Sequence, residues 1–167
     1  MKRLASVLLA LCQIALSLLL LSCEQRGDFL FYQREAFCAS VTFSAEERTV
    51  EGTLCREKDG ARRFSFTAPD ALSGISLLAD TEGRYFLSYE GMTEEVSGQA
   101  EALLVAFDLL SLTPSGRIRY LKDGAVFPTE GGQATVKTGE NGYPLSVTLE
   151  SEGGKATLTV AAWEVLP

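Results

Sequence analysis

Histidine is absent from this sequence, and its absence excludes several kinds of site at once. Histidine is the commonest general base in enzymes and the commonest side-chain metal ligand. The sequence also lacks the H-E-x-x-H, G-x-S-x-G and serine–lysine arrangements that mark many hydrolases. Carboxylates do cluster at Glu90, Glu94 and Glu95, but a solvated loop explains them better than a metal site. We therefore expect a protein that is not an enzyme and needs no cofactor or metal.

Basic residues are also scarce. Lysine and arginine together number 15, against 22 aspartate and glutamate residues, which gives a formal net charge of −7. Nucleic acids and anionic lipid surfaces both attract clustered positive charge. The acidic balance therefore argues against a nucleic-acid partner and against a protein face that lies flat on a membrane.

Charged residues are nearly missing from the first 23 positions. Lys2 and Arg3 precede an apolar run over residues 4–21, which ends in Leu20-Leu21-Ser22-Cys23 before the chain turns polar. A charged start, an apolar middle and a small residue before a cleavage point are typical of a secretory signal peptide. The Leu-Leu-Ser-Cys ending resembles a bacterial lipobox, which is cut before a cysteine that carries a diacylglycerol on its sulfur. A membrane-spanning helix is the alternative, because the run approaches the required length, but it does not account for the small residue followed by cysteine.

This pattern predicts a lipoprotein signal peptide at residues 1–22 and a lipid anchor at Cys23. Several acyl chains on one cysteine give a stable membrane attachment, which a single chain does not. We therefore expect the protein outside the cytoplasm, anchored to a bacterial membrane through lipidated Cys23. Residues 23–36 would form the anchored N-terminus and a short helix capped by Asp28. Residues 37–167 would form a single domain.

Alternation between apolar and polar residues dominates the chain from Phe37 onward. This pattern is typical of half-buried strands in an antiparallel sheet that is wet on one face. The clearest expected strands span residues 37–43, 50–54, 63–67, 75–79, 85–89, 133–138, 145–149 and 156–162, with a further short one at 117–121.

Residues 100–112 break the alternation with strong helix formers and almost no polar side chains. A helix that is apolar nearly all round must be buried on most sides. We expect this helix to lie on the concave side of the sheet. The predicted fold class is therefore α+β, with a curved antiparallel sheet wrapped around one or two helices.

Two of the four cysteines are expected to face each other across a hairpin. The chain must reverse between Phe43 and Val50, and pairing these two residues also places Cys38 opposite Cys55, with residues 45–48 as a four-residue loop. Directly opposed Cβ atoms lie about 4.5–5.5 Å apart, near the range of a disulfide. Export provides an oxidising environment. We predict a structural disulfide, and two free thiols in a host that lives without oxygen are the alternative.

Several segments together resemble the LolA/LolB-type lipoprotein-carrier superfamily. An aromatic strand that ends in proline, Ala61-Arg-Arg-Phe-Ser-Phe-Thr-Ala-Pro69, is followed by Leu72-Ser-Gly74 and by a turn and aromatic strand over residues 80–89. Asn141-Gly-Tyr-Pro144 is similar to the entry into that family's last hairpin. The resemblance covers most of the chain after Cys23. It implies an unclosed β-barrel wrapped around helices, with an apolar cavity that takes acyl chains.

The expected function follows from a surplus of apolar side chains on the inner face. We expect an envelope lipoprotein that binds an acyl chain or another apolar ligand in the half-barrel. A solid core made of the same residues is the alternative for each of them, and the alternative function is a tethered protein-interaction or scaffold module that binds an envelope protein. The candidate lining residues are Phe64, Phe66, Tyr85, Leu87, Tyr89, Leu103 and Phe107.

Overall fold

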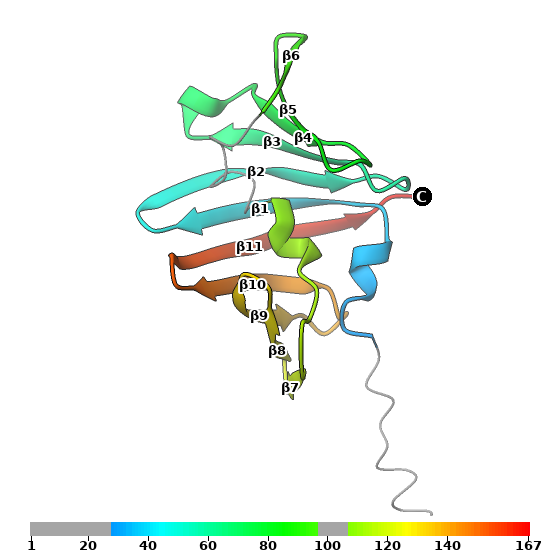
Figure 1. Ribbon diagram of the computed structural model, residues 1–167. Helices are drawn as coiled ribbons and strands as arrows, with labels where there is room; N and C mark the ends of the chain where they lie inside the picture. The colour runs from blue at the N-terminus through cyan, green and yellow to red at the C-terminus, as the bar shows by residue number, and fades with distance from the viewer. Residues whose placement is uncertain (1–27, 97–106) are drawn as a thin grey trace, which may run out of the picture.

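A single curved sheet dominates the computed structural model, which describes residues 28–96 and 107–167. Its order is β6-β5-β4-β3-β2-β1-β11-β10-β9-β8-β7, so the first and last strands of the chain pair in the middle (Figure 1). Every neighbouring pair is antiparallel. The strands are β1 (Phe37–Ala45), β2 (Arg48–Arg56), β3 (Arg62–Ala68), β4 (Ser76–Ala79), β5 (Tyr85–Tyr89), β6 (Met92–Glu95), β7 (Arg119–Leu121), β8 (Gly124–Thr129), β9 (Gly132–Thr138), β10 (Pro144–Ser151) and β11 (Gly154–Val165).

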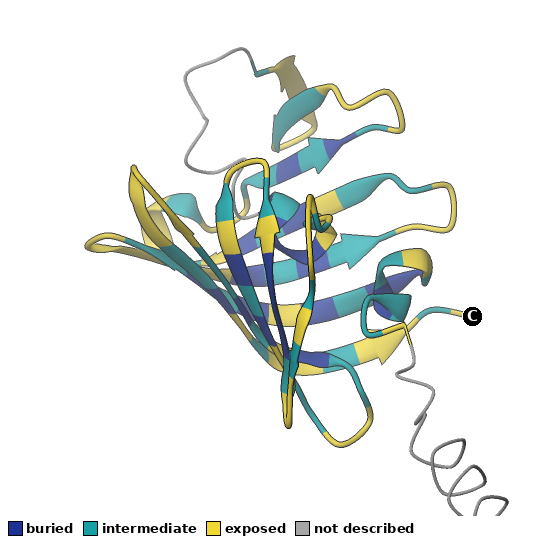
Figure 2. Cartoon of the chain, turned by 60° about the horizontal axis from the view of Figure 1, so that its bottom comes forward, coloured by how far each residue is buried: buried dark blue, intermediate teal, exposed yellow. Residues whose placement is uncertain are grey.

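The sheet bends without closing, and its buried side chains point to the concave side. Figure 2 shows the two halves of the sheet facing each other, with buried positions along the strands and exposed positions at the turns. Because side chains alternate along each strand, the convex face carries the polar partners of the buried residues. Hydroxyl pairs join neighbouring strands on that face, at Ser65 and Ser76 (3.0 Å) and at Thr148 and Thr157 (3.2 Å). The predicted unclosed, curved sheet is therefore confirmed.

The β1–β2 hairpin has the register that the apolar pattern predicts. Phe43 lies opposite Val50, and Cys38 lies opposite Cys55. The predicted four-residue loop is wrong, because Ala45 pairs with Arg48 and leaves a two-residue turn at Glu46 and Glu47. Glu46 has a φ of 53°, the left-handed conformation that two-residue hairpin turns require.

Register shifts in two strand pairs place some side chains on the opposite face from the one that simple alternation predicts. The register between β1 and β11 slips next to Val41, so Ala39 lies opposite Trp163. Trp163 thus packs on the core cluster, and Ala162, expected on the apolar face, is exposed. A similar slip near Pro144 leaves Leu145 with 53% of its surface exposed, although it was expected to face inward.

The helical content differs from the expectation. The helical turns in the described ranges are short, at η1 (Phe31–Arg34), η2 (Asp70–Leu72) and η3 (Leu109–Ser111), and Phe107 and Asp108 lead helically into η3. Most of the predicted helix at 100–112, including Leu103, lies outside the described residues. The short helix expected after Asp28 is only the four-residue η1. Asp28 accepts a hydrogen bond from the Leu30 amide (3.0 Å) but does not cap η1.

Two strands were missed. Residues 92–95 form β6, although the glutamates there were expected to lie in a loop. β8 buries Ala125, Val126 and Phe127 consecutively, so it lacks the alternation by which the other strands were found. The signal peptide and Cys23 lie outside the described residues, and the proposed domain limits stay a prediction.

Candidate functional site

Most of the candidate lining residues come together on the concave side of β3 and β5, where Phe107 packs over them. The rings of Phe64 and Phe66 have centroids 4.7 Å apart, and Phe107 lies 6.5 Å from Phe64 and 6.2 Å from Tyr85. Phe64, Phe66 and Phe107 are buried, whereas Tyr85 and Leu87 are half-buried. These rings fill the space beneath the Phe107 segment, as a core does.

Tyr89 behaves differently from the other candidates. It lies at the end of β5 opposite Met92, and the two side chains are 46% and 66% exposed. Tyr89 therefore belongs to an exposed apolar tip of the β5–β6 hairpin and not to the aromatic cluster. The assignment of the remaining residues to a ligand site stays a prediction.

Arg62 joins the Phe107–Ser111 segment to the sheet. Its guanidinium donates hydrogen bonds to Asp108 Oδ1 (3.0 Å), to the Phe107 carbonyl (3.3 Å) and to Ser111 Oγ (3.2 Å). It also lies 5.6 Å from the centre of the Phe107 ring, a cation–π contact. The Tyr85 hydroxyl donates a hydrogen bond to Asp108 at 3.4 Å. The pKa of Tyr85 is raised, mainly by burial and to a smaller extent by the negative charge of Asp108.

Sequence reasoning missed Arg62, although a signal was present. Arg62 occupies the same alternation phase as Phe64 and Phe66, so it had to point to the apolar face. A charged residue in that phase needs a partner, because an unpaired charge in a core is costly.

A cleft of about 320 Å³ opens at the other end of the concave face, between the tips of the β1–β2 and β10–β11 hairpins. Phe43, Ala45, Leu149 and Ala156 form its apolar floor, and Glu46, Arg48 and Lys155 lie at its edge. Ala45 pairs with Ala156, which in turn pairs with Leu149, so small side chains lie beside one another at this end. None of these residues was expected in the site, because the pairing of β1 with β11 cannot be read from local alternation.

A second aromatic cluster fastens η1 to the sheet. The Trp163 ring stacks on Phe37 at 4.0 Å between centroids and contacts Tyr32 and Tyr143 at 5.7 and 5.2 Å. The Tyr143 hydroxyl donates to Glu35 at 2.9 Å, and this hydrogen bond raises the pKa of Tyr143. Burial raises the pKa of Tyr32 far above its usual range, and the Gln33 side chain opposes part of this rise. The N-terminal segment is thereby fixed beside the sheet (Figure 1).

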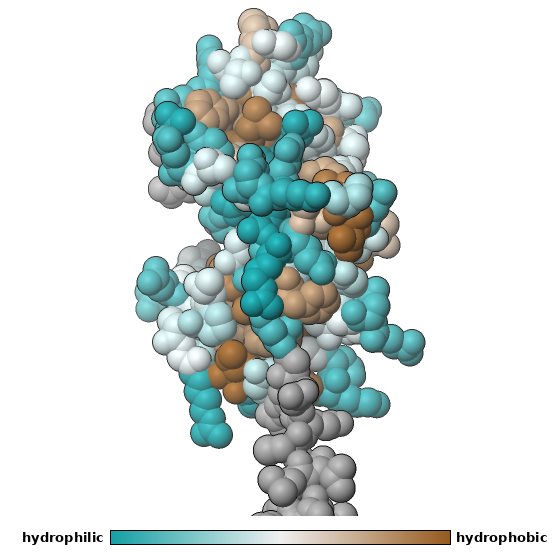
Figure 3. Space-filling model, turned by 90° about the vertical axis from the view of Figure 1, so that its right-hand side faces the viewer, coloured by the Kyte–Doolittle hydropathy of each residue, from teal (hydrophilic) through white to brown (hydrophobic). Residues whose placement is uncertain are grey.

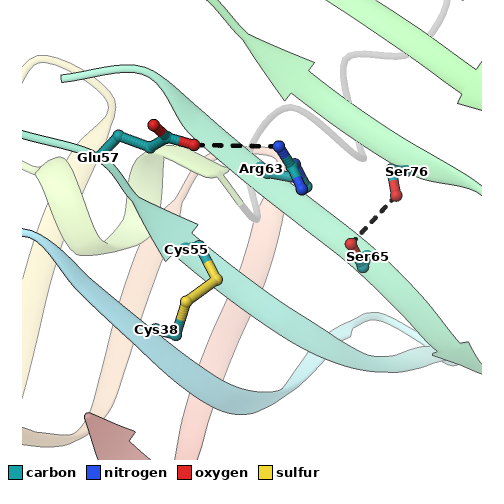
Figure 4. The surroundings of a disulfide bond; sticks show 6 residues. All are labelled: Cys38, Cys55, Glu57, Arg63, Ser65 and Ser76. Carbon is teal, nitrogen blue, oxygen red and sulfur yellow. Dashed lines mark hydrogen bonds and ion pairs between the residues drawn. A yellow bond between two sulfur atoms is a disulfide. The ribbon is translucent and has the colours of Figure 1, made fainter. Parts of the chain in front are cut away.

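The predicted disulfide between Cys38 and Cys55 is present. Figure 4 shows it joining β1 to β2 near the Ser65–Ser76 hydroxyl pair and the ion pair between Arg63 and Glu57. All of these contacts lie on the convex face, opposite the aromatic cluster. The disulfide therefore links two strands of the sheet and does not line the concave site.

Other kinds of site find no support in the part of the chain that the structure describes. Residues 28–96 and 107–167 contain no group of three side chains that could hold a metal ion. In the same ranges no helix has both the length and the hydrophobicity to cross a bilayer. On the side that carries the C-terminus, hydrophobic patches alternate with hydrophilic side chains (Figure 3).

Comparison with known proteins gives a likeness of fold. No protein-family model and no curated protein matches the sequence. The structure of an uncharacterised conserved protein from Thermus thermophilus superposes with a TM-score of 0.52 at 16% identity, over 87% of this chain and 88% of that one.

Structures with lower scores include a LolA superfamily protein from Nitrosomonas europaea (TM-score 0.49, 9% identity, 86% of this chain and 91% of that one). They also include a putative outer membrane lipoprotein-sorting protein domain from Vibrio parahaemolyticus (TM-score 0.42, 13% identity, 78% of this chain and 85% of that one). At an identity of 16%, the likeness to the Thermus thermophilus structure concerns the fold alone.

Proposed function

We propose that this protein is a membrane-tethered, non-enzymatic binding protein of the bacterial envelope that holds an acyl chain or another apolar ligand on its concave face. The observation that carries the proposal is the cleft between the hairpin tips, whose floor is apolar and whose volume is about 320 Å³. Ligand pockets in proteins have volumes of about 300–1,000 Å³, so this cleft suits one slender chain. Phe64, Phe66 and Phe107 are buried against one another, so we place the proposed ligand at the cleft and keep the aromatic lining as a separate prediction.

The proposed attachment rests on the sequence. A lipidated Cys23 followed by a short polar spacer would hold the domain beside the membrane, and the acidic balance gives the domain no attraction of its own for anionic lipid. The proposed location is therefore outside the cytoplasm, on the membrane surface.

Ligand binding can be tested with the full-length protein purified in detergent and with a fluorescent fatty acid as the probe. Ala156→Trp would fill the cleft, and we expect it to weaken binding at least tenfold. Thr159→Trp places the same side chain on the same strand but on the convex face, and it should bind as the wild type does. Mass analysis of an organic extract should also identify an acyl species carried by the wild type. If the wild-type protein neither carries nor binds an acyl chain, the proposal is wrong.

A second candidate function is supported by the exposed tip at Tyr89 and Met92. Two large apolar side chains side by side on a hairpin turn are unusual on a solvated surface and are typical of a protein-binding site. In this case the protein would act as a tethered interaction module for an envelope protein. Crosslinking in the host should then trap one abundant partner, and Tyr89→Ser with Met92→Ser should abolish the adduct while leaving fatty-acid binding intact.

A further inference from the structure

The two outermost strands of the sheet, within residues 28–96 and 107–167, run in the same direction. β6 and β7 are the first and last of eleven strands, and all ten neighbouring pairs are antiparallel. Strand direction therefore alternates an even number of times between the two edges, which leaves β6 and β7 parallel. A second copy that continues the sheet, with its concave face on the same side, would place its β7 beside β6 as a parallel neighbour.

The two edges carry opposite charge. Glu90, Glu94 and Glu95 lie on β6 and its turn, without a basic residue among them. Arg117, Arg119 and Lys122 lie on β7 and its flanks, together with one acidic residue, Asp123, so this edge has a net positive charge. The three glutamates and the three basic side chains are exposed, and none forms a salt bridge with another described residue. The edges are thus complementary to each other, at opposite ends of one molecule (Figure 1).

Backbone groups of β6 face outward, and charged side chains of the two edges lie on the same face. The Val96 amide donates to the Tyr85 carbonyl at 2.8 Å, so by alternation the backbone groups of Thr93 and Glu95 face away from β5. Glu95 lies opposite Phe86 and Arg119 lies opposite Val126, positions that both belong to the convex face. In a continued sheet the two charges would stand on the same face.

We propose that the acidic β6 edge of one copy binds the basic β7 edge of a second copy, so that neighbouring anchored molecules join into a larger sheet. The contact is weak in free solution, because the strands are short and exposed ion pairs contribute little. On a membrane the shared anchor raises the effective concentration to the millimolar range, where such a contact becomes populated. This association needs no acyl ligand, but it rests on the membrane anchor of the proposed function.

Zero-length carbodiimide crosslinking tests the contact, because the reagent joins a carboxylate to an amine only when the two touch. The full-length lipidated protein, as an equal mixture of unlabelled and ¹⁵N-labelled chains, is placed on phosphatidylcholine vesicles at increasing surface density. We expect mixed-isotope peptides that join Lys122 to Glu94 or Glu95, because a parallel pair places Lys122 at that end of β6. Their yield should rise with density.

Charge reversal then separates a specific contact from crowding. Arg117→Glu with Arg119→Glu retains Lys122 and all three glutamates, yet should reduce the crosslink at least fivefold. Mixing this variant with Glu94→Lys/Glu95→Lys should restore links between the two chains. Arg48→Glu with Lys58→Glu makes the same change in net charge away from both edges and should leave the yield unchanged. Absence of the Lys122 link at every density, or an undiminished link after the reversal at 117 and 119, would overturn the proposal, and fatty-acid binding is unaffected by either result.

Discussion

Arg62 and Arg63 are adjacent in the sequence and have different surroundings. The Arg62 side chain is only 18% exposed and contacts three acceptors on the Phe107–Ser111 segment. Arg63 is 56% exposed and lies 3.9 Å from Glu57 on the convex face. Alternation along a strand thus gives two identical side chains different roles.

We predict that Arg62→Gln lowers the free energy of unfolding by about 1–3 kcal/mol, because it removes charge-assisted hydrogen bonds from partly buried acceptors. Arg63→Gln is the matched control and should change stability by less than about 0.5 kcal/mol, as is usual for an exposed pair. Urea denaturation measures both. Equal losses for the two variants would show that the Arg62 contacts do not hold the segment.

Tyr32 provides a second test at this scale. Its side chain is fully buried, and burial raises its pKa far above the usual range. A raised pKa means that the unfolded chain loses this proton first, so stability is complete below the unfolded pKa of about 10 and falls as the pH rises above it. Tyr32→Phe should therefore be at least as stable as the wild type at pH 7, and its unfolding free energy should fall less steeply above pH 10. The exposed Tyr89→Phe is the control, and urea denaturation along a pH series measures all three proteins.

Among the strands, β2 and β3 approach each other closely at Gly52, where the Phe64 ring also packs. A Cβ at this position of β2 would lie 2.4 Å from the Ser65 carbonyl oxygen and 2.8 Å from the Phe64 ring. Gly52→Ala should therefore destabilise the protein by about 1–3 kcal/mol through overpacking. Gly153→Ala, where the nearest atom would be 3.7 Å away, should be nearly neutral in the same thermal unfolding experiment. A neutral Gly52→Ala would mean that β2 and β3 separate easily.

The disulfide strengthens a hairpin whose register is already fixed by apolar residues. Cys38 and Cys55 are 17 residues apart, and closing a loop of about that length stabilises a protein by roughly 3 kcal/mol in the chain-entropy model. We predict that Cys38→Ser with Cys55→Ser loses about 2–3 kcal/mol but retains the native far-ultraviolet circular dichroism. Loss of the native circular dichroism spectrum in the double variant would show that the disulfide, and not the pattern of apolar residues, sets the register of the hairpin.

The sequence was informative where side chains alternate regularly. The β1–β2 register followed from Phe43, Val50 and the two cysteines, since one pairing satisfied all of them. Ala162 and Leu145 were misplaced because each lies at a register shift, which interrupts the alternation and leaves no local signal. β8 was missed because three consecutive buried residues do not alternate.

The candidate site was harder to predict than the fold. Phe64, Phe66 and Phe107 were correctly grouped by their hydrophobicity, but hydrophobicity cannot distinguish a filled core from a cavity lining. The cleft at Ala45 and Ala156 depends on two alanines from opposite ends of the chain that meet only through the β1–β11 pair. The cleft exists only because β1 and β11 pair, and neither strand's sequence alone predicts that pairing.

For the whole molecule, stability should decrease from the middle of the sheet to its edges. β1, β2 and β11 are paired on both sides and carry much of the buried core, whereas all four residues of β6 are exposed. Native-state hydrogen exchange should therefore show the strongest amide protection in the three central strands and the weakest in β6 and β7. Protection of β6 equal to that of β1 in the vesicle-bound protein, but not in dilute detergent, would point to the proposed contact between copies.

The pairing of β1 with β11 has a consequence for how the chain reaches its native state. Strands β1–β6 and strands β7–β11 each form a meander from neighbouring segments, but the seam between the two halves joins Phe37–Ala45 to the last strand. Contacts between such distant segments form slowly because a long loop must close first. If the chain is exported from its N-terminus, as the proposed function implies, the first half emerges with one side of β1 unpaired until the last residues arrive.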